Sequence, residues 1–546
     1  MVPTDIQRKI INNPGNTVVL ASPGSGKTFV MSEKIKKVLN DGNLLDYQGI
    51  IAISYTRKAS ANLKTKSLTL GIDRKNSYFG TIDSFCLTQI VLPFGRFLFG
   101  HPQKNVVPVA LKDLVTERQS DYVWISNKHP EYDEINELAW DNIKALFLEG
   151  YVLIESLELV ALFLIKNSKA CRMYLSSRFR YVFIDEYQDA DCYTDGVFHE
   201  LLNLGMNGVV VGDVNQSIFG FAHKNSKFLM AVQQEESFTS YKLIENHRCS
   251  ISIINYSNRL LDSGSPIILT DEVGVYLLNI NGTEEQVAYC LSSFIPMLCD
   301  QNSGINRSEI AILVKNVRTL KIMDKALTIP HRLVETTDLD MDMNLRSRLY
   351  AQLLQFYFNQ KMSLIQIVDD YVDYGMLTKI NRERLSEQEQ CIRRIGEDEV
   401  RILRYPFVAI AEILLPHIKE DASLTKLDIV LSDEKALNTY KPLCDNEIVL
   451  MTLHKSKGLE FDVVFHMNLN EWELPYQRVD NGDFRSPIYP TWDQDLNLHY
   501  VGVTRARKQC YLITNSLRTN SEGETKTGKP SIFLQMNNLQ TLRKSY

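Results

Sequence analysis

The sequence predicts an α/β protein with parallel sheets. Short, β-branched apolar runs alternate with longer segments in which apolar residues recur at helical spacing. A phosphate-binding loop at residues 21–28 lies between the first such run and the first helical segment. The composition is that of a globular protein, because 44% of the 546 residues are hydrophobic and 23% are charged. At this length we expect several domains.

Apolar runs mark the predicted strands. Strands of a parallel sheet are buried on both faces, so they read as near-continuous apolar segments rather than as alternating ones. The runs cover residues 17–20, 50–54, 181–184, 208–211, 310–314, 448–451, 463–465 and 511–514. They fall into two groups, before and after about residue 245, which predicts two α/β domains.

Long helix-rich stretches interrupt both strand groups and are the predicted insertions. The first α/β domain and its insertion are expected at residues 1–85, 175–245 and, inserted, 86–174. The second domain and its shorter insertion are expected at residues 246–345, 440–546 and, inserted, 346–439. Residues 515–530 are polar and rich in Gly, Ser and Thr, so we expect a loop there.

The loop ASPGSGKT predicts a nucleoside triphosphate site. Gly24 and Gly26 let backbone N–H groups close around phosphate oxygens at the start of a helix. Lys27 adds a positive charge, and Thr28 offers a hydroxyl to Mg²⁺. Ala21 departs from the strict pattern, which has Gly at this position. The candidate ligands are Ala21, Ser22, Pro23, Gly24, Ser25, Gly26, Lys27 and Thr28.

Two carboxylates, Asp185 and Glu186, follow the apolar run at 181–184. The end of a strand beside a phosphate-binding loop is where a metal ion and an attacking water are held. Asp185 is therefore the candidate Mg²⁺ ligand, and Glu186 is the candidate base that orients and deprotonates the water. The alternative is a helix start, at which acidic residues are common.

Taken in order, the motifs of this chain resemble those of superfamily-one helicases of the UvrD/Rep/PcrA type, over nearly its whole length. The segments that carry the resemblance are ASPGSGKT, ISYTRKASANL from Ile53, GTIDSF from Gly80, VVGDVNQSIFGF from Val210, LIENHRCS from Leu243, IVLMTLHKSKGLEFDVVF from Ile448 and HYVGVTRARK from His499. In that family, Ala at the first loop position is common. The resemblance implies two RecA-like domains, each with a mainly helical insertion. It also implies an ATP- and Mg²⁺-dependent motor that steps 3′ to 5′ along single-stranded DNA.

The same resemblance implies roles for residues around the nucleotide. Gln216 is expected to sense the γ-phosphate, while Arg248 and Arg505 are expected to act as arginine fingers. If these arginines belong to the second domain, the fast hydrolytic step requires domain closure.

The resemblance implies further nucleotide contacts elsewhere in the chain. Gln7 looks like a reader of adenine, and Glu460 would hold the ribose beside Gly458. His247 stands where the family usually has a Tyr that stacks on adenine.

A single-strand groove is implied by the segments that line it in the family. The candidate DNA contacts are Tyr55, Thr56, Arg57, Thr81, Phe221 and His454. Aromatic stacking on bases tolerates any sequence, as a translocating enzyme requires. Taken singly, Tyr55 and Phe221 are more typical of core aromatics than of stacking platforms, and only the occurrence of all the motifs in family order favours the DNA role.

Net charge, cysteine spacing and the length of apolar stretches argue against several other classes of function. The formal net charge of −6 gives no overall attraction to nucleic acid, so DNA binding must come from a local groove. The nine cysteines include no C-x-x-C pair, which argues against a zinc or iron–sulfur site. No apolar stretch approaches the roughly 20 residues of a membrane helix, so we expect a soluble, cytoplasmic protein with no membrane partner.

Two rival interpretations remain. One is a partner-dependent ATPase that senses DNA, such as the helicase-like subunit of a Gabija-type anti-phage system. The expected partners are then DNA ends or junctions and a separate nuclease or repair subunit. The other is a P-loop ATPase that ignores nucleic acid.

Overall fold

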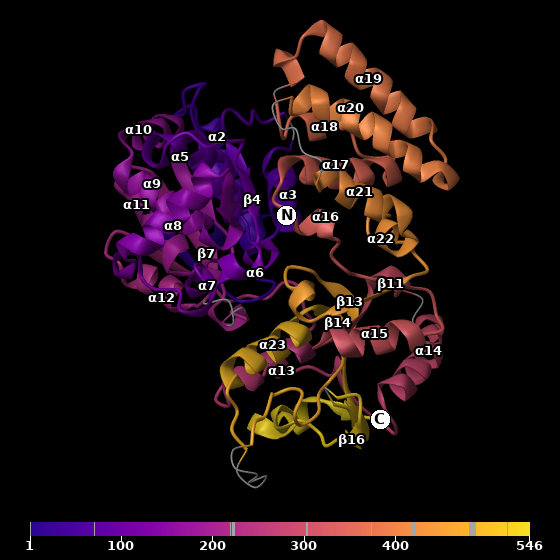
Figure 1. Cartoon of the computed structure of the whole chain (residues 1–546). Helices are drawn as coiled ribbons and strands as arrows, with labels where there is room; N and C mark the ends of the chain where they lie inside the picture. The colour runs from indigo at the N-terminus through magenta and orange to yellow at the C-terminus, as the bar shows by residue number, and fades with distance from the viewer. Residues whose placement is uncertain are drawn as a thin grey trace. The chain divides into compact units, whose positions relative to one another are not determined.

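The predicted α/β class is confirmed by a computed structural model, which has two parallel sheets flanked by helices (Figure 1). The described residues are 2–69, 71–218, 220, 224–301, 304–372, 374–416, 422–479, 487–520 and 522–546. The chain divides into two compact units. The first comprises Met1–Ile305, Glu309–Leu327 and Thr452–Tyr546, and the second comprises Asn306–Ser308 and Thr328–Met451. The first unit contains strands of both sheets, so this division does not follow the predicted domain plan, which stays a prediction.

The first sheet has the strand order β3-β2-β6-β7-β1-β8. Its strands are β1 Thr17–Ala21, β2 Gly49–Ile53, β3 Tyr78–Gly80, β6 Phe179–Ile184, β7 Asn207–Gly212 and β8 Thr239–Leu243. All are parallel, with Val19 opposite both Val211 and Tyr241. The carboxyl ends of β1, β6 and β7 therefore meet at one edge, and the phosphate-binding loop and the Asp-Glu pair emerge there.

The second sheet has the strand order β11-β12-β10-β13-β14-β9-β17. Its strands are β9 Val275–Ile280, β10 Ile310–Val314, β11 His331–Leu333, β12 Ile448–Thr452, β13 Phe461–His466, β14 Ala506–Asn515 and β17 Lys544–Ser545. β13 and β14 pair in parallel, with Phe465 opposite Tyr511. The predicted strands are all present, and β14 begins five residues earlier than the apolar run indicates because its polar first half is also paired.

The first unit contains most of the helices. Those longer than one turn are α1 Asp5–Asn12, α2 Lys27–Asn40, α3 Arg57–Ser67, α5 Leu92–Phe99, α7 Val123–Asn127, α8 Glu137–Leu148, α9 Leu157–Asn167, α10 Lys169–Arg178, α11 Cys192–Asn203, α12 Lys227–Gln234, α13 Ile251–Leu261, α14 Glu284–Gln301, α15 Val317–Ala326 and α23 Trp492–Thr504. One-turn helices are α4 Ile82–Phe85 and α6 Thr116–Gln119. Short strands β4 Val107–Val109 and β5 Tyr151–Leu153 pair in parallel. The expected loop at 515–530 is instead largely an antiparallel hairpin of β15 Leu517–Thr519 and β16 Thr525–Thr527.

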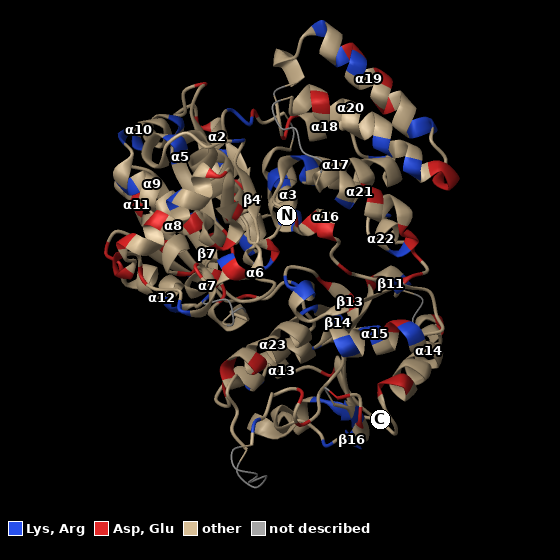
Figure 2. Cartoon of the chain, viewed as in Figure 1, with Lys and Arg blue, Asp and Glu red and all other residues tan. Residues whose placement is uncertain are grey.

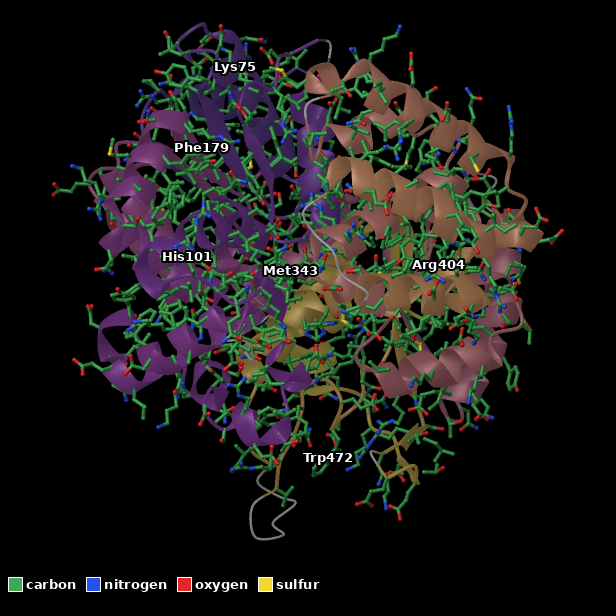
Figure 3. All side chains as sticks on the ribbon, turned by 45° about the horizontal axis from the view of Figure 1, so that its top comes forward. Lys75, His101, Phe179, Met343, Arg404 and Trp472 are labelled. Carbon is green, nitrogen blue, oxygen red and sulfur yellow. The ribbon has the colours of Figure 1, made fainter. Side chains whose placement is uncertain are left out.

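One helical segment of the first unit is long and apolar enough to span a membrane by composition. It runs over Ile82–Phe99 through α4, the π-helix Cys86–Val91 and α5, with a mean hydropathy of 1.3. However, 44% of it is buried within the protein. The ring of Phe85 meets Phe179 of β6, labelled in Figure 3, edge-on at 6.2 Å. We therefore interpret the segment as a core helix.

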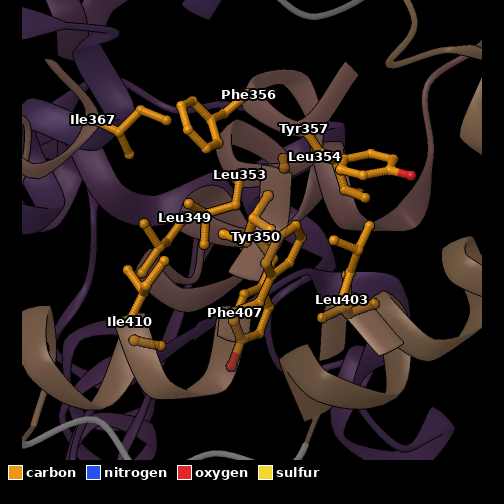
Figure 4. Packing of buried hydrophobic residues seen from close by; sticks show 14 of the residues in the cluster. Leu349, Tyr350, Leu353, Leu354, Phe356, Tyr357, Ile367, Leu403, Phe407 and Ile410 are labelled. Carbon is orange, nitrogen blue, oxygen red and sulfur yellow. The ribbon is translucent and has the colours of Figure 1, made fainter. Parts of the chain in front are cut away.

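The second unit is mainly helical. Its helices are α16 Asp338–Met341, α17 Leu345–Phe358, α18 Leu364–Val368, α19 Lys379–Arg394, α20 Arg404–Leu414, α21 Ala422–Ser432 and α22 Glu434–Asn438. They share a core of their own, in which Leu349, Tyr350 and Phe407 are fully buried (Figure 4). On α19 only Leu385 and Ile392 are buried, and the helix carries residues of both charge signs (Figure 2).

Candidate nucleotide site and DNA-facing segments

The phosphate-binding loop connects β1 to α2. Gly24 (φ +70°) and Gly26 (φ +87°) adopt the left-handed conformation that favours glycine. The hydroxyl of Ser25 donates to the carbonyl oxygen of Ser22 over 2.7 Å, which closes the turn. Gly26 directly precedes α2, so the free N–H groups of the first helical turn face the loop.

Gln7 lies beneath this loop. Its Nε2 donates to the carbonyl oxygen of Ser25 over 3.3 Å, and its Oε1 accepts from the backbone N–H of Thr4 over 3.0 Å. A Cβ at Gly26 would approach Nε2 of Gln7 to 2.9 Å. Close contact with Gln7 is thus a second reason for glycine at position 26.

The ammonium group of Lys27 is buried at the base of the loop. Its Nζ lies 3.5 Å from Oε1 of Glu186, and it has no hydrogen-bond partner within the described part of the chain. Burial alone would lower the pKa of Lys27, but the attraction of Glu186, Asp213 and Asp185 raises it. A charged, buried ammonium without a hydrogen-bond acceptor is suited to binding a phosphate oxygen.

Asp185 and Glu186 stand at the end of β6 with opposite pKa shifts. Burial and the adjacent Glu186 raise the pKa of Asp185. For Glu186, burial opposes ionisation, but the nearby Lys27 and Lys457 lower the pKa. Glu186 lies at the start of the one-turn helix Tyr187–Asp189, yet its side chain makes no capping hydrogen bond. The helix-start alternative therefore does not account for its carboxylate.

Gln188 and Gln216 connect these carboxylates to the end of β7. Oε1 of Gln188 accepts from the backbone N–H of Asp213 over 2.9 Å, while its Nε2 donates to Glu186. Nε2 of Gln216 donates to Oδ2 of Asp213 over 2.9 Å. Both glutamines are buried, so this network holds the ends of β6 and β7 together.

Arg505, just after α23, reaches the same network. It is 2% exposed and donates to Oε1 of Gln216 over 3.2 Å and to the carbonyl oxygen of Leu459 over 3.1 Å. Burial and the nearby Arg248 lower the pKa of Arg505 to about 10, so the guanidinium stays charged at neutral pH. A buried cation thus lies close to Glu186 and Asp213, both of which raise its pKa in turn.

Arg248 belongs to a segment that contacts the phosphate-binding loop. The backbone N–H of His247 donates to the carbonyl oxygen of Gly24 over 3.0 Å. Nε of Arg248 lies 2.6 Å from Oε2 of Glu460. Glu460, the predicted ribose ligand, therefore forms an ion pair with a predicted arginine finger.

The remaining nucleotide candidates make fewer contacts. His247 is exposed, with Nε2 3.8 Å from a carboxylate oxygen of Glu245. Gly458 has φ +81°, and no atom of the described residues would lie within 4 Å of a Cβ added there. Thr28 is half-buried in the first turn of α2, and among the described residues no hydrogen bond joins it to Asp185.

Two predicted DNA contacts begin helices. Oγ1 of Thr56 accepts from the backbone N–H of Ala59 over 3.1 Å at the start of α3. Oγ1 of Thr81 accepts from the backbone N–H of Ser84 over 3.3 Å at the start of α4. Both threonines are therefore helix caps, a structural role that is independent of DNA.

The other predicted DNA contacts differ in exposure. The Tyr55 ring lies under two ammonium groups, with Lys224 at 4.8 Å and Lys457 at 5.9 Å from its centroid. Arg57 is half-buried in the first turn of α3. Burial lowers the pKa of His454, which keeps the imidazole neutral. Phe221 lies outside the described residues.

Comparison with known proteins identifies the family. Residues 4–98 and 102–237 match the UvrD/REP helicase N-terminal domain, and residues 358–517 match the UvrD-like helicase C-terminal domain. The chain belongs to the UvrD-like helicase family. This confirms the predicted resemblance and, with it, the expected enzyme class of an ATP-dependent DNA helicase.

Several curated proteins are similar to this UvrD-like helicase over most of its length. The Gabija protein GajB of Bacillus cereus (strain VD045) is 23% identical over 529 residues, which covers 95% of this chain and 97% of that protein. The ATP-dependent DNA helicase PcrA of Staphylococcus epidermidis is 24% identical over 631 residues, covering 95% and 84%. A probable DNA helicase II homolog of Mycoplasma pneumoniae is 23% identical over 607 residues, covering 92% and 82%.

Lys457 of this UvrD-like helicase is a site residue that the sequence analysis missed. Its Nζ donates to the carbonyl oxygen of Gln216 over 2.6 Å, contacts Asp189, and lies 3.8 Å from Oε2 of Glu186. Gln188 was missed as well. Lys457 lies inside the motif that begins at Ile448, and Gln188 lies two residues after Glu186, so a polar side chain in or beside a motif was the available signal, but only the fold brings these residues to Glu186.

Proposed function

We propose that the protein is an ATP- and Mg²⁺-dependent translocase and helicase. It moves 3′ to 5′ on single-stranded DNA in the cytoplasm, and hydrolysis is coupled to closure of its two RecA-like domains. The observation that carries the proposal is the hydrogen bond of 3.2 Å from Arg505 to Gln216. This bond joins α23, beside the second sheet, to the end of β7 in the first sheet, next to Lys27 and Glu186.

Several features fit a bound ATP. The ammonium of Lys27 has no hydrogen-bond acceptor within the described chain, and the glycines at 24 and 26 leave the loop backbone open to phosphate oxygens. Thr28 and Asp185 would hold Mg²⁺; burial and, secondarily, the adjacent Glu186 raise the pKa of Asp185, and a bound cation would favour its ionised form. When bound, Mg²⁺ neutralises charge on the β- and γ-phosphate oxygens.

Side chains of the protein carry out the remaining catalytic roles. Glu186 is held ionised by Lys27 and Lys457, so its carboxylate can orient the attacking water and accept its proton. Lys27, Arg248 and Arg505 stabilise charge on the transferred phosphoryl group. Gln216 reports the state of the γ-phosphate to Arg505 through their shared hydrogen bond.

Coupling to DNA runs through Lys457 and Tyr55. Lys457 contacts the Glu186 side of the nucleotide site, and its ammonium also lies 5.9 Å from the Tyr55 ring. A shift of Lys457 on hydrolysis therefore changes the surroundings of Tyr55. Tyr55, Thr56, Arg57, Thr81, Phe221 and His454 are the proposed DNA contacts, in which a base–aromatic stack contributes about 1–3 kcal/mol.

The test measures ATPase rate with single-stranded DNA, blunt duplex or RNA, and unwinding of duplexes with a 3′ or a 5′ tail. We expect stimulation by single-stranded DNA and unwinding only from the 3′ tail. Unwinding from the 5′ tail alone would contradict the polarity. An ATPase rate that ignores all nucleic acids would contradict the motor itself.

The second candidate is a DNA-sensing ATPase subunit of a Gabija-type anti-phage complex, with little unwinding activity of its own. The lengths favour it, because the chain spans 97% of GajB but 84% of the S. epidermidis PcrA. Its partner would be a separate nuclease or repair subunit at DNA ends or junctions. Strand displacement measured with and without the products of neighbouring genes separates the two. Processive unwinding of long tailed duplexes by the purified protein alone excludes this candidate.

A further inference from the structure

A buried lysine joins the helix after the phosphate-binding loop to the helix that carries Gln7. Lys34, in the middle of α2, is 1% exposed. Its Nζ donates to the carbonyl oxygens of Ile10, over 2.8 Å, and Asn13. These carbonyls are at the end of α1, where acceptors lack regular partners within the helix. The carbonyl oxygen of Ile10 also accepts from the backbone N–H of Asn13 over 3.3 Å. The ammonium therefore caps α1 from the side.

The burial of the Lys34 ammonium carries a cost in free energy. A buried ammonium loses its hydration, and only hydrogen bonds or a counter-charge compensate for that loss. Burial and the nearby Lys37 lower the pKa of Lys34 to about 8, so the charged form still predominates at neutral pH. The negative end of the α1 dipole is the partner that keeps the charge favourable.

The opposite end of α1 is attached to the loop itself. Gln7, in the first turn, donates to the carbonyl oxygen of Ser25 and forms a capping box with Thr4. Between the two ends, Ile10 is fully buried in the core that also contains Ile35 of α2. α1 has only eight residues, so Lys34 and Gln7 together determine where it sits against α2 and the loop.

The position of α1 determines where the hydrogen-bonding groups of the Gln7 amide lie relative to the base of a bound nucleotide. Its bonds to Thr4 and Ser25 use one lone pair and one N–H, and the amide retains one further acceptor and one further donor. A donor and an acceptor side by side match the exocyclic amine and N7 of adenine. Guanine presents two acceptors at the same edge and does not match.

We propose that Lys34 is a positioning residue for nucleotide selection, because it holds α1 so that Gln7 distinguishes ATP from GTP. This inference rests on the proposed role of Gln7 in reading adenine. Lys34 does not contact the nucleotide; it acts through the placement of α1.

Steady-state ATPase and GTPase kinetics of Lys34→Met test the proposal. We expect KM for ATP to rise about tenfold, while KM for GTP and both kcat values change little, since the net contribution of one hydrogen bond corresponds to about a factor of ten. Lys37→Met is the matched control. Lys37 also bridges α2 to α1, over 2.8 Å to Oδ1 of Asn12, but this contact is exposed, so both KM values should remain unchanged. Equal changes of KM for ATP and GTP in Lys34→Met would overturn the proposal.

A double-mutant cycle with Gln7→Ala shows whether Lys34 acts through Gln7. If it does, Lys34→Met adds little to the increase in KM for ATP that Gln7→Ala already causes. Full additivity would overturn the proposal. If Lys34→Met does not fold, Lys34→Gln, which keeps a neutral donor, enters the same cycle. If Gln7→Ala still prefers ATP over GTP as the wild type does, the proposed role of Gln7 in reading adenine is wrong. Stimulation of the ATPase by DNA, measured on the same variants, tests the motor function separately from the roles of Lys34 and Gln7.

Discussion

Arg505 donates a hydrogen bond to Gln216 over 3.2 Å, and both side chains are buried. Gln216 in turn donates to Asp213 at the end of β7, and Arg505 donates to the backbone beside Glu460. One bond thus connects the motif that we propose senses the γ-phosphate to the motif that we propose holds the ribose. We therefore expect loss of this bond to impair ATP hydrolysis while ATP binding is retained.

Replacing Arg505 by Lys is the first test. We expect kcat for ATP hydrolysis to fall by about 10³-fold, because an arginine finger contributes roughly 10³ to 10⁵ in rate. Lysine cannot reproduce the planar donor geometry. Arg118→Lys is the control, since Arg118 also donates two hydrogen bonds to one acceptor group, the Glu149 carboxylate, each over 2.6 Å, but lies in the predicted first insertion, away from Gln216 and Glu460. A normal kcat in Arg505→Lys would assign the residue to the core.

Lys27→Ala and Glu186→Gln test the hydrolytic site itself. Both should abolish turnover, because the first removes the phosphate contact and the second removes the base. Their binding should differ: Glu186→Gln is expected to retain ATP, and Lys27→Ala is expected to lose it. Equilibrium binding of a fluorescent ATP analogue distinguishes them. Retained hydrolysis in either variant is incompatible with the proposed site.

Lys457→Met probes the contact between Lys457 and the buried Asp189. Asp189 is 3% exposed, so removal of its cation should destabilise the protein by about 3–5 kcal/mol. Lys457→Met combined with Asp189→Asn should recover much of that loss, because no buried charge is left unpaired. Chemical denaturation measures both. If the double variant stays stable and DNA still fails to stimulate its ATPase, Lys457 has a coupling role beyond stability.

Phe221→Ala tests the predicted base-stacking position. DNA-stimulated ATPase should weaken by about tenfold or more, because one lost stack costs about 1–3 kcal/mol, while nucleotide binding stays normal. Titration of ATPase rate against oligonucleotide concentration gives the change in apparent affinity. An unchanged response to DNA would assign Phe221 to the hydrophobic core.

The pH dependence of stability has a predicted contribution from His199. Hydrogen bonds to Asp195, and secondarily to Glu235, raise the pKa of His199 to about 10 against the opposing effect of burial. The protonated form is therefore favoured in the folded state. Its contribution is complete below about pH 6.5 and is lost as the pH rises towards 10. The pairs are about one-third exposed, so we expect roughly 1 kcal/mol at most. Denaturation of wild type and His199→Gln at pH 6 and pH 10 should show a difference at pH 6 only.

The central strands of both sheets are predictable from sequence because burial on both faces requires apolar runs. β8, TSYKL, has only its last residue buried, so its sequence carries no such signal. β9 is missed for a related reason, since its second half is partly exposed. Peripheral strands are determined by their neighbours in the sheet, which a single sequence does not reveal.

The candidate site is predictable where chemistry restricts the residue type, as in the glycines of the loop and the Asp-Glu pair. Lys457 and Gln188 could not be found in this way, because a solvated lysine or glutamine has the same sequence pattern. Their roles depend on contacts with Glu186 that only the folded chain brings about. Conversely, Thr56 and Thr81 match DNA-contact motifs, but the structure also gives them a capping role that accounts for the residue type.

Glu186 adopts φ +57° and ψ +39°, a conformation that costs a non-glycine residue about 1–2 kcal/mol. Glycine or asparagine would adopt it more cheaply. A lineage that no longer needed ATP turnover would therefore gain folding stability by losing this glutamate. Folding stability and the proposed catalytic role of Glu186 therefore oppose each other at this position.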